Sequence, residues 1–292
     1  METLPVRLYA AFAADETGGN MSAAVFEDMP LWPAARRRIA ADLGAPVTGF
    51  VRQLAGDRFE TKFLSPFSEI DMSGHGAVAV FSALRDDGRI GPGAFVLETE
   101  SGEIAVDVAP EGSIALRQPL PDFTTSAPGS AELASLLGVT ASAVVKVSAA
   151  SLGHRLIFVQ LADPETLAAI HPETTALDGY CRARSVDGIG VWWPAFSGLG
   201  KMKIRLRAFR RGAAGFGETA GDTTSAALAC TLLRSHSLLP GAGGQAVLVA
   251  EQGAELCRPS IVRTVLNTLE GEITGVSVGG YAALRMTGEV VV

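Results

Sequence analysis

Two polar clusters, each followed by a run of small apolar residues, carry the side chains that could do chemistry. They span residues 72–76 (MSGHG) and 217–225 (GETAGDTTS). The runs behind them predict buried helices over 73–84 and 222–233. The start of a helix exposes unpaired N–H groups and the positive end of the helix dipole. Each cluster is therefore a candidate binding site for a substrate carboxylate.

Asp222 and His75 are the candidate catalytic residues in these clusters. An imidazole in the first turn of a helix can donate or accept a proton near pH 7, and a partly desolvated carboxylate can act as a base. Glu218 and Glu69 are further carboxylates that could take part. The alternative is that Ser73 and Asp222 are only N-caps and that His75 is structural. The presence of a polar cluster at both helix starts favours function.

The side chains around both helix starts are candidate substrate anchors. Asn20 follows two glycines, so it lies either in an ordinary turn before a strand or on a backbone that turns its amide toward a carboxylate. The glycines that flank His75 leave its ring room to approach a ligand. The candidate binding residues are Asn20, Ser73, Gly74, Gly76, Glu218, Thr223, Thr224 and Ser225.

The cysteines and the remaining histidines show no metal-ligand spacing. The three cysteines are far apart, and no HxH or HExxH pattern occurs. The pair Gly215-x-Gly217 is too short for a dinucleotide-binding fingerprint. We therefore expect neither a metal nor a cofactor. The histidines outside the first cluster, His154, His171 and His236, are predicted to be structural.

Composition narrows the class of protein. The chain has 292 residues, 48% of them hydrophobic, which suggests two domains with sizeable cores. Its formal net charge is −7, and no basic patch is present that could bind nucleic acid or a membrane surface. It has no long apolar run, and its first residues lack the pattern of a signal peptide. We expect a cytoplasmic protein whose partner is a small molecule.

The elements that must position the two clusters form a weak internal repeat. Residues 73–108 and 222–262 each combine a helix of small residues with two β-like runs and Gly-rich turns. This favours two similar α+β domains, each with a sheet curved around a central helix. We expect these domains over 1–120 and 130–292. The last strand of the chain has two alternative places: it packs within the second domain or returns to pack on the first. Further helices are predicted over 32–43 and 164–170.

Along nearly its whole length the chain resembles the PhzF-like phenazine-biosynthesis isomerases, which have the diaminopimelate-epimerase fold. The resemblance implies mostly antiparallel sheets, an active site in the cleft between the domains, cofactor-independent proton transfer on a small acid, and a homodimer. The matching segments are 18–26 (family pattern SGNPLAVV), 63–69 with 73–76 (FTPxxE…GHP), 205–209, 251–260 (QGxxxGRPS) and 276–280.

The departures from the family pattern bear on mechanism. The family's catalytic Glu falls on Val47, and the Asp of its second motif falls on Ala220. The two cysteines of the related epimerases fall on Ser73 and Asp222. We therefore expect an isomerase in which Asp222 and His75 transfer protons. The alternatives are a lyase or cyclase on the same scaffold and a non-catalytic protein that binds small acids.

Overall fold

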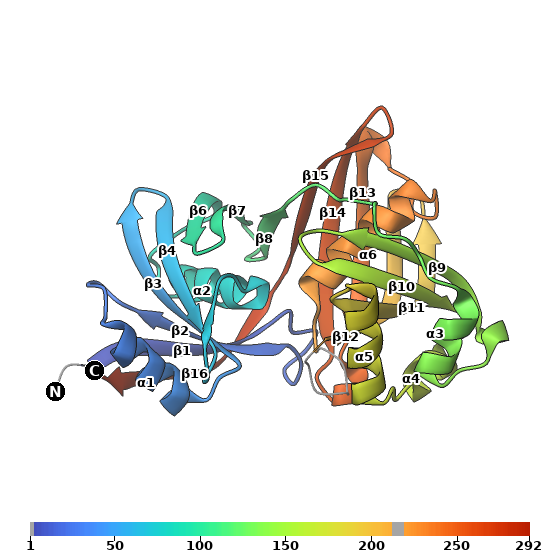
Figure 1. The fold of residues 1–292 in the computed structure, drawn as a ribbon. Helices are drawn as coiled ribbons and strands as arrows, with labels where there is room; N and C mark the ends of the chain where they lie inside the picture. Colours follow the sequence, from blue (N-terminus) through green and yellow to red (C-terminus); the bar gives the residue numbers. More distant parts are fainter. Residues whose placement is uncertain (1–2, 212–218) are drawn as a thin grey trace. The chain divides into compact units, whose positions relative to one another are not determined.

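The computed structural model describes residues 3–211 and 219–292, which form two compact units (Figure 1). Unit 1 consists of Met1–Arg117 together with Gly279–Val292, and unit 2 of Gln118–Val278. Each unit is a sheet with one 13-residue helix packed against it, α2 (Gly74–Asp86) in unit 1 and α6 (Asp222–Arg234) in unit 2. The expected α+β class, with a sheet around a central helix, is confirmed.

The sheet of unit 1 is mostly antiparallel. Its strand order is β16-β1-β2-β3-β4-β6-β7-β8, with the short β5 paired to β4. Only the pairs β2–β3 and β4–β6 run parallel. The strands are β1 (Thr3–Ala11), β2 (Asn20–Phe26), β3 (Val47–Ala55), β4 (Arg58–Leu64), β5 (Glu69–Ile70), β6 (Gly93–Thr99), β7 (Gly102–Val108), β8 (Ile114–Gln118) and β16 (Ala282–Val291).

Two helices cover opposite faces of this sheet. Helix α1 (Pro33–Leu43) makes the crossover between the parallel strands β2 and β3 and packs Ile39 against Val25 and Phe50. Helix α2 lies on the other face, where Gly49 of β3 allows Val80 to approach. A Cβ at Gly49 would come within 2.6 Å of a Val80 methyl group, so the helix packs this closely only against glycine.

Unit 2 has the strand order β15-β14-β13-β12-β11-β10-β9. Its parallel pairs are β10–β11 and β12–β13. The strands are β9 (Val144–Ser151), β10 (Arg155–Leu161), β11 (Gly188–Gly198), β12 (Lys201–Arg210), β13 (Gln245–Gln252), β14 (Ser260–Leu269) and β15 (Glu272–Gly280). Besides α6, its helices are α3 (Ser130–Leu137), α4 (Pro164–Ala169) and α5 (Thr174–Arg184), with 3-10 turns at Ala141–Ala143, Ala242–Gly244 and Ala254–Leu256.

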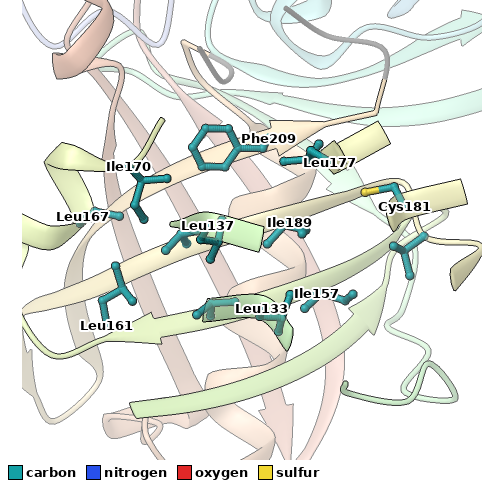
Figure 2. Packing of buried hydrophobic residues seen from close by; sticks show 13 residues of the cluster. Leu133, Leu137, Ile157, Leu161, Leu167, Ile170, Leu177, Cys181, Ile189 and Phe209 are labelled. Carbon is teal, nitrogen blue, oxygen red and sulfur yellow. The ribbon is translucent and has the colours of Figure 1, made fainter. Parts of the chain in front are cut away.

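Helices α3, α4 and α5 cover the face of β10 and β11 that points away from α6 (Figure 2). Alternate residues of a strand point to opposite faces, so Ile157 and Val159 enter this core while Phe158 points toward α6. The side chains that close the core are Leu133 and Leu137 of α3, Leu167 of α4, Leu177 and Cys181 of α5, and Ile189 and Phe209 of the sheet.

The predicted helices over 32–43, 73–84, 164–170 and 222–233 are all present, but α3 and α5 were not predicted. Helix α3 begins at Ser130, where the second domain was expected to begin, and this start was not recognised as that of a helix. Helix α5 is polar over most of its length, and only Leu177 and Cys181 are buried. Two buried residues in eleven are too few to produce a clear helical pattern in the sequence.

The two units repeat one order of elements. In unit 1 an antiparallel pair, a crossover to a parallel strand, a hairpin, the central helix and a second parallel strand follow one another from β1 to β6. In unit 2 the same steps lead from β9 to β13, with α4 and α5 in the crossover. The expected internal repeat is therefore a repeat of structure. Within the described ranges, no helix is long and apolar enough to cross a membrane.

Candidate functional site

Ser73 caps helix α2. Its backbone is extended, and its Oγ accepts a hydrogen bond of 3.2 Å from the N–H of Gly76. The same Oγ lies 3.3 Å from Nδ1 of His75, in the first turn as expected. Ser73 is 7% exposed, so its hydroxyl is held between the helix backbone and the imidazole ring. The first turn of α2 thus places a partly buried histidine beside a buried hydroxyl.

Gly76 has a packing role. A Cβ on this residue would lie 2.8 Å from the ring of Phe63 and 3.0 Å from a methyl group of Val47. We had expected Gly76 to leave room for the His75 ring to approach a ligand. Instead, Phe63 and Val47 fill the space beside Gly76. Val47 begins β3 and is 5% exposed, so the position of the family's glutamate holds a buried aliphatic side chain.

The other candidates of unit 1 lie at strand starts. Asn20 is the first residue of β2, is partly buried and pairs with Ala11. Glu69 begins β5, and its carboxylate lies 3.8 Å from Arg37 with both side chains 59% exposed. An ion pair in that much solvent contributes little, and Glu69 is a surface carboxylate.

Helix α6 begins at Asp222, and its N-cap residue is Gly221. The alternative interpretation of Asp222 as the N-cap is therefore wrong by one position. The carboxylate of Asp222 accepts a 2.8 Å hydrogen bond from the N–H of the next residue, Thr223, and is partly exposed. The carboxylate therefore lies at the positive end of the helix dipole.

The cap of α6 comes from a distant strand. Gln252, the last residue of β13, accepts a 2.9 Å hydrogen bond from the N–H of Gly221 and donates a 2.8 Å bond to Oγ of Ser225. Ser225 in turn donates to the carbonyl of Gly221 at 2.8 Å. The predicted binding residue Ser225 thus has its hydroxyl engaged in a closed, buried network. Gln252 lies in a segment that carries the family resemblance, but no role was predicted for it.

The other residues of the second cluster lie in different surroundings. Thr223 is partly exposed at the helix start. Thr224 is 1% exposed, and its hydroxyl has no hydrogen-bond partner within the part of the chain that the structure describes. Ala220, at the position of the family's Asp, is buried. Glu218 lies outside the described residues.

His154 joins the charged groups near the start of α6. Its Nδ1 lies 3.9 Å from Oδ2 of Asp187, and half of its side chain is exposed. Burial and the charge of Arg210 lower the pKa of His154 below its ordinary value, while Asp187 and Asp222 act in the opposite direction. His154 was predicted to be structural because it lacks the setting of His75, in a helix start between two glycines. Only the folded chain brings it near Asp222.

Thiol chemistry has no suitable group in the buried core. Burial raises the pKa of Cys230, inside α6, to about 12, and that of Cys181 to about 11. Both cysteines remain thiols at neutral pH. Among the residues that the structure describes, no three His, Cys, Asp or Glu side chains come together as a metal site would require.

The sequence resemblance can now be compared with known proteins. The PhzC-PhzF family model, described as "Phenazine biosynthesis-like protein", matches residues 9–288. The chain belongs to this family. Within the family it is 28% identical to an uncharacterized isomerase of Deinococcus radiodurans, over 98% of this chain and 95% of the relative. It is also 28% identical to the trans-2,3-dihydro-3-hydroxyanthranilate isomerase of Pseudomonas fluorescens, over 96% of this chain and 97% of the relative.

Solved structures agree with the family on the fold. A Bacillus anthracis phenazine biosynthesis protein of the PhzF family superposes with a TM-score of 0.85 at 22% identity, covering all of both chains. A hydroxyproline epimerase from Agrobacterium vitis gives a TM-score of 0.56 at 13% identity, covering 99% of this chain and 91% of that one. The resemblance to PhzF-like proteins is confirmed, and the isomerase names of its relatives support the isomerase class for this enzyme.

Proposed function

We propose that this enzyme isomerises a small carboxylate-bearing metabolite by general acid/base proton transfer, without a cofactor. The observation that carries the proposal is the start of α6, where Gln252 accepts the N–H of Gly221 and the partly exposed Asp222 accepts the N–H of Thr223 with one carboxylate oxygen. Asp222 takes a proton from a carbon next to the substrate's carboxylate or carbonyl group. Backbone N–H groups of the first helical turn stabilise the negative charge that develops there.

The assignment of Asp222 as the base follows from the side chains in the first turn of α6. Thr223 and Thr224 carry hydroxyls, which are weak bases at neutral pH. Ala220 and Val47 cannot exchange protons at all. We assign the second proton-transfer role to His75, whose imidazole contacts the capping Ser73 at the start of α2. Asn20 and Thr223 are assigned to substrate binding.

The substrate class rests on the same backbone feature. The positive end of a helix dipole attracts an anion, and a small acid supplies one in its carboxylate. The substrate in the name of the Pseudomonas fluorescens relative, trans-2,3-dihydro-3-hydroxyanthranilate, is also a small carboxylic acid. It is the first compound to test.

The test is hydrogen exchange in deuterated water. The wild-type enzyme is expected to release product that carries one solvent deuterium at carbon, as measured by NMR and mass spectrometry. Asp222→Asn keeps the shape of the side chain and removes the base, so it should lower the rate by about 10²- to 10⁴-fold. The matched control is Glu165→Gln, which removes an exposed carboxylate from the first turn of α4. Full exchange in the Asp222→Asn variant would refute the assignment.

The buried Val47 favours a second candidate. A chain that lacks the family's glutamate could bind small acids without chemistry, or catalyse a lyase or cyclisation step instead. A product that differs in mass from its substrate identifies the lyase. Binding of several small acids with no deuterium incorporation from any of them identifies the binding protein.

We further propose that the enzyme is a homodimer, as the family resemblance implies. Light scattering of the purified protein over a hundredfold range of concentration tests this. A mass of about 30 kDa, that of one chain, throughout the range would contradict it.

A further inference from the structure

The parallel strand pairs of the two units give a residue-by-residue correspondence. In unit 1 the first residue of β3, Val47, pairs with Ser22 of β2. In unit 2 the first residue of β11, Gly188, pairs with Leu156 of β10. Because the two units repeat the same order of elements, Leu156 holds in unit 2 the place that Ser22 holds in unit 1.

Asn20 lies two residues before Ser22, and His154 lies two residues before Leu156. His154 is therefore the counterpart in unit 2 of Asn20 in unit 1. Asn20 begins β2, and His154 immediately precedes the first residue of β10. Side chains two residues apart point to one face of a strand. Leu156 and Phe158 therefore share one face of β10, and His154 lies in the bend that leads into this strand. Phe158 lies beside Gly190, next to the first turn of α6.

The first turn of α6 lies on this face of the strand. The side-chain methyl group of Thr224, the third residue of α6, would lie 3.1 Å from a Cβ on Gly190, which pairs with Phe158. The end of β12 is also here, because Arg210 pairs with Gly188. The turn that holds His154 is thus near the start of α6 rather than its end.

Charged groups from every neighbouring element face His154. Asp187, before β11, lies 3.9 Å away, Arg210 ends β12, and Asp222 begins α6. Asp187 is itself held by the N–H of Arg155 at 2.9 Å and by the guanidinium of Arg211 at 3.8 Å. The ring is 50% exposed, which leaves it accessible to a ligand.

We propose that His154 is a ligand-binding residue of the α6 site, the counterpart in unit 2 of Asn20 in unit 1, and that its imidazole hydrogen-bonds a polar group of the bound acid. The inference rests on the proposed function for the class of ligand. It does not require turnover, because binding alone engages the ring.

The correspondence with Asn20 predicts which substitution is tolerated. The amide of Asn can place a hydrogen-bonding nitrogen close to the position of imidazole Nδ1, whereas Ala has none. His154→Asn should therefore keep the affinity for the acid within about threefold, and His154→Ala should weaken it by about tenfold, the worth of one hydrogen bond. A residue that only shapes the turn would not separate the two variants in this way.

The ring should also make binding depend on pH. Burial and Arg210 hold the pKa of His154 below its ordinary value of 6.5, so the ring is neutral at pH 7.5 and gains charge as the pH falls. The charged imidazolium attracts a carboxylate more strongly. Binding of an anion by the wild type should therefore tighten between pH 7.5 and pH 5.5, and His154→Asn should lose that part of the gain.

The experiment is calorimetric titration with 3-hydroxyanthranilate, the aromatic acid that lacks the reactive ring hydrogens, at both pH values. The variants are His154→Ala, His154→Asn and, as matched control, His171→Asn, whose exposed ring bonds the carbonyl of Ala169. Affinity of His154→Ala equal to wild type, or unchanged pH dependence in His154→Asn, would overturn the inference.

The outcomes separate this inference from the proposed function. If the variants behave as expected but no acid exchanges deuterium, His154 binds the ligand and the isomerase chemistry fails. If exchange proceeds and the variants bind normally, the chemistry stands and His154 has no part in it. A wild-type protein that does not bind the probe at all overturns the inference.

Discussion

Helices α2 and α6 occupy equivalent places in the two units, yet their first turns are capped from different distances along the chain. Ser73 caps α2 from within its own first turn. The cap of α6 comes from Gln252, 31 positions away on β13. In α2 the hydroxyl of Ser73 accepts the N–H of Gly76 and so serves as the cap. In α6 the N–H of Gly221 is satisfied from elsewhere, and Asp222 accepts the N–H of Thr223 with one of its two carboxylate oxygens.

This difference teaches where chemistry can reside in a duplicated scaffold. A short polar side chain at a helix start can hydrogen-bond the backbone there, and this bonding competes with binding of a ligand. Because Gln252 accepts the N–H of Gly221, the first turn of α6 in unit 2 can carry an ionisable side chain, Asp222, whose Oδ1 accepts the N–H of Thr223. Unit 1 offers its histidine instead, with the ring against the capping hydroxyl.

Among the substitutions that test this comparison, Gly253→Ala is expected to lower the free energy of unfolding most. Gly253 directly follows Gln252, the residue that caps α6. Gly253 has a φ of +75°, and a Cβ there would lie 2.3 Å from the carbonyl oxygen of Arg258 and 2.7 Å from that of Thr219. The substitution should lower the free energy of unfolding by about 3 kcal/mol, from backbone strain and the clash together. Urea denaturation measures it. Gly243→Ala is the matched control, because Gly243 has a φ of +78° with nothing within 4 Å, and it should cost about 1 kcal/mol.

Removal of the distant cap should have the next largest effect. Gln252→Ala leaves the buried N–H of Gly221 without its acceptor and should lower the free energy of unfolding by about 2 kcal/mol. Gln245→Ala, which shortens an exposed glutamine at the start of the same strand, should change it by less than about 0.5 kcal/mol. Equal effects of the two substitutions would show that Gln252 is not the cap of α6.

Loss of the local cap should cost less. Ser73→Ala removes the oxygen that accepts the N–H of Gly76 and should lower the free energy of unfolding by about 1 kcal/mol. Ser73→Asn retains a capping oxygen and should recover most of that loss. If Ser73→Ala were more damaging than Gln252→Ala, the ranking of local and distant caps would be reversed.

The smallest effect is expected from His154→Asn, on the change of stability with pH. Of the two corresponding residues Asn20 and His154, only the histidine titrates. The pKa of His154 is lowered in the folded chain, so the unfolded chain binds more protons as the pH falls below 6.5. His154 therefore supports stability at neutral pH, and this support is lost as the pH falls through its folded pKa. The melting temperature of His154→Asn should drop less between pH 7.5 and pH 5.0 than that of the wild type. An identical drop in both proteins would show that His154 does not contribute.

The sequence predicted those features that depend on neighbouring residues. The starts of α2 and α6, the cap at Ser73 and the buried helices follow from local patterns of polar and small side chains. The cap at Gln252 could not be predicted in this way, because the residues that it joins meet only after β13 pairs with β12.

The place of His154 was missed for a related reason. Its correspondence with Asn20 appears only when β10 and β2 are compared through their pairing registers. The two segments share only a glycine of positive φ directly before the residue, Gly19 and Gly153, and a mostly apolar strand after it, which is too little to align them by sequence. The family resemblance could identify only residues within the matching segments. His154 lies in none of these segments.

Strand β16 pairs with β1, so unit 1 is built from both ends of the described chain, while unit 2 is one continuous segment. During synthesis this reverses the order expected from the sequence. The chain that has left the ribosome up to Val278 contains all of unit 2, whereas β1 still lacks a neighbour on one edge until Ala282–Val291 emerges. Until β16 emerges, the edge of β1 that it will cover stays open and can pair with another strand.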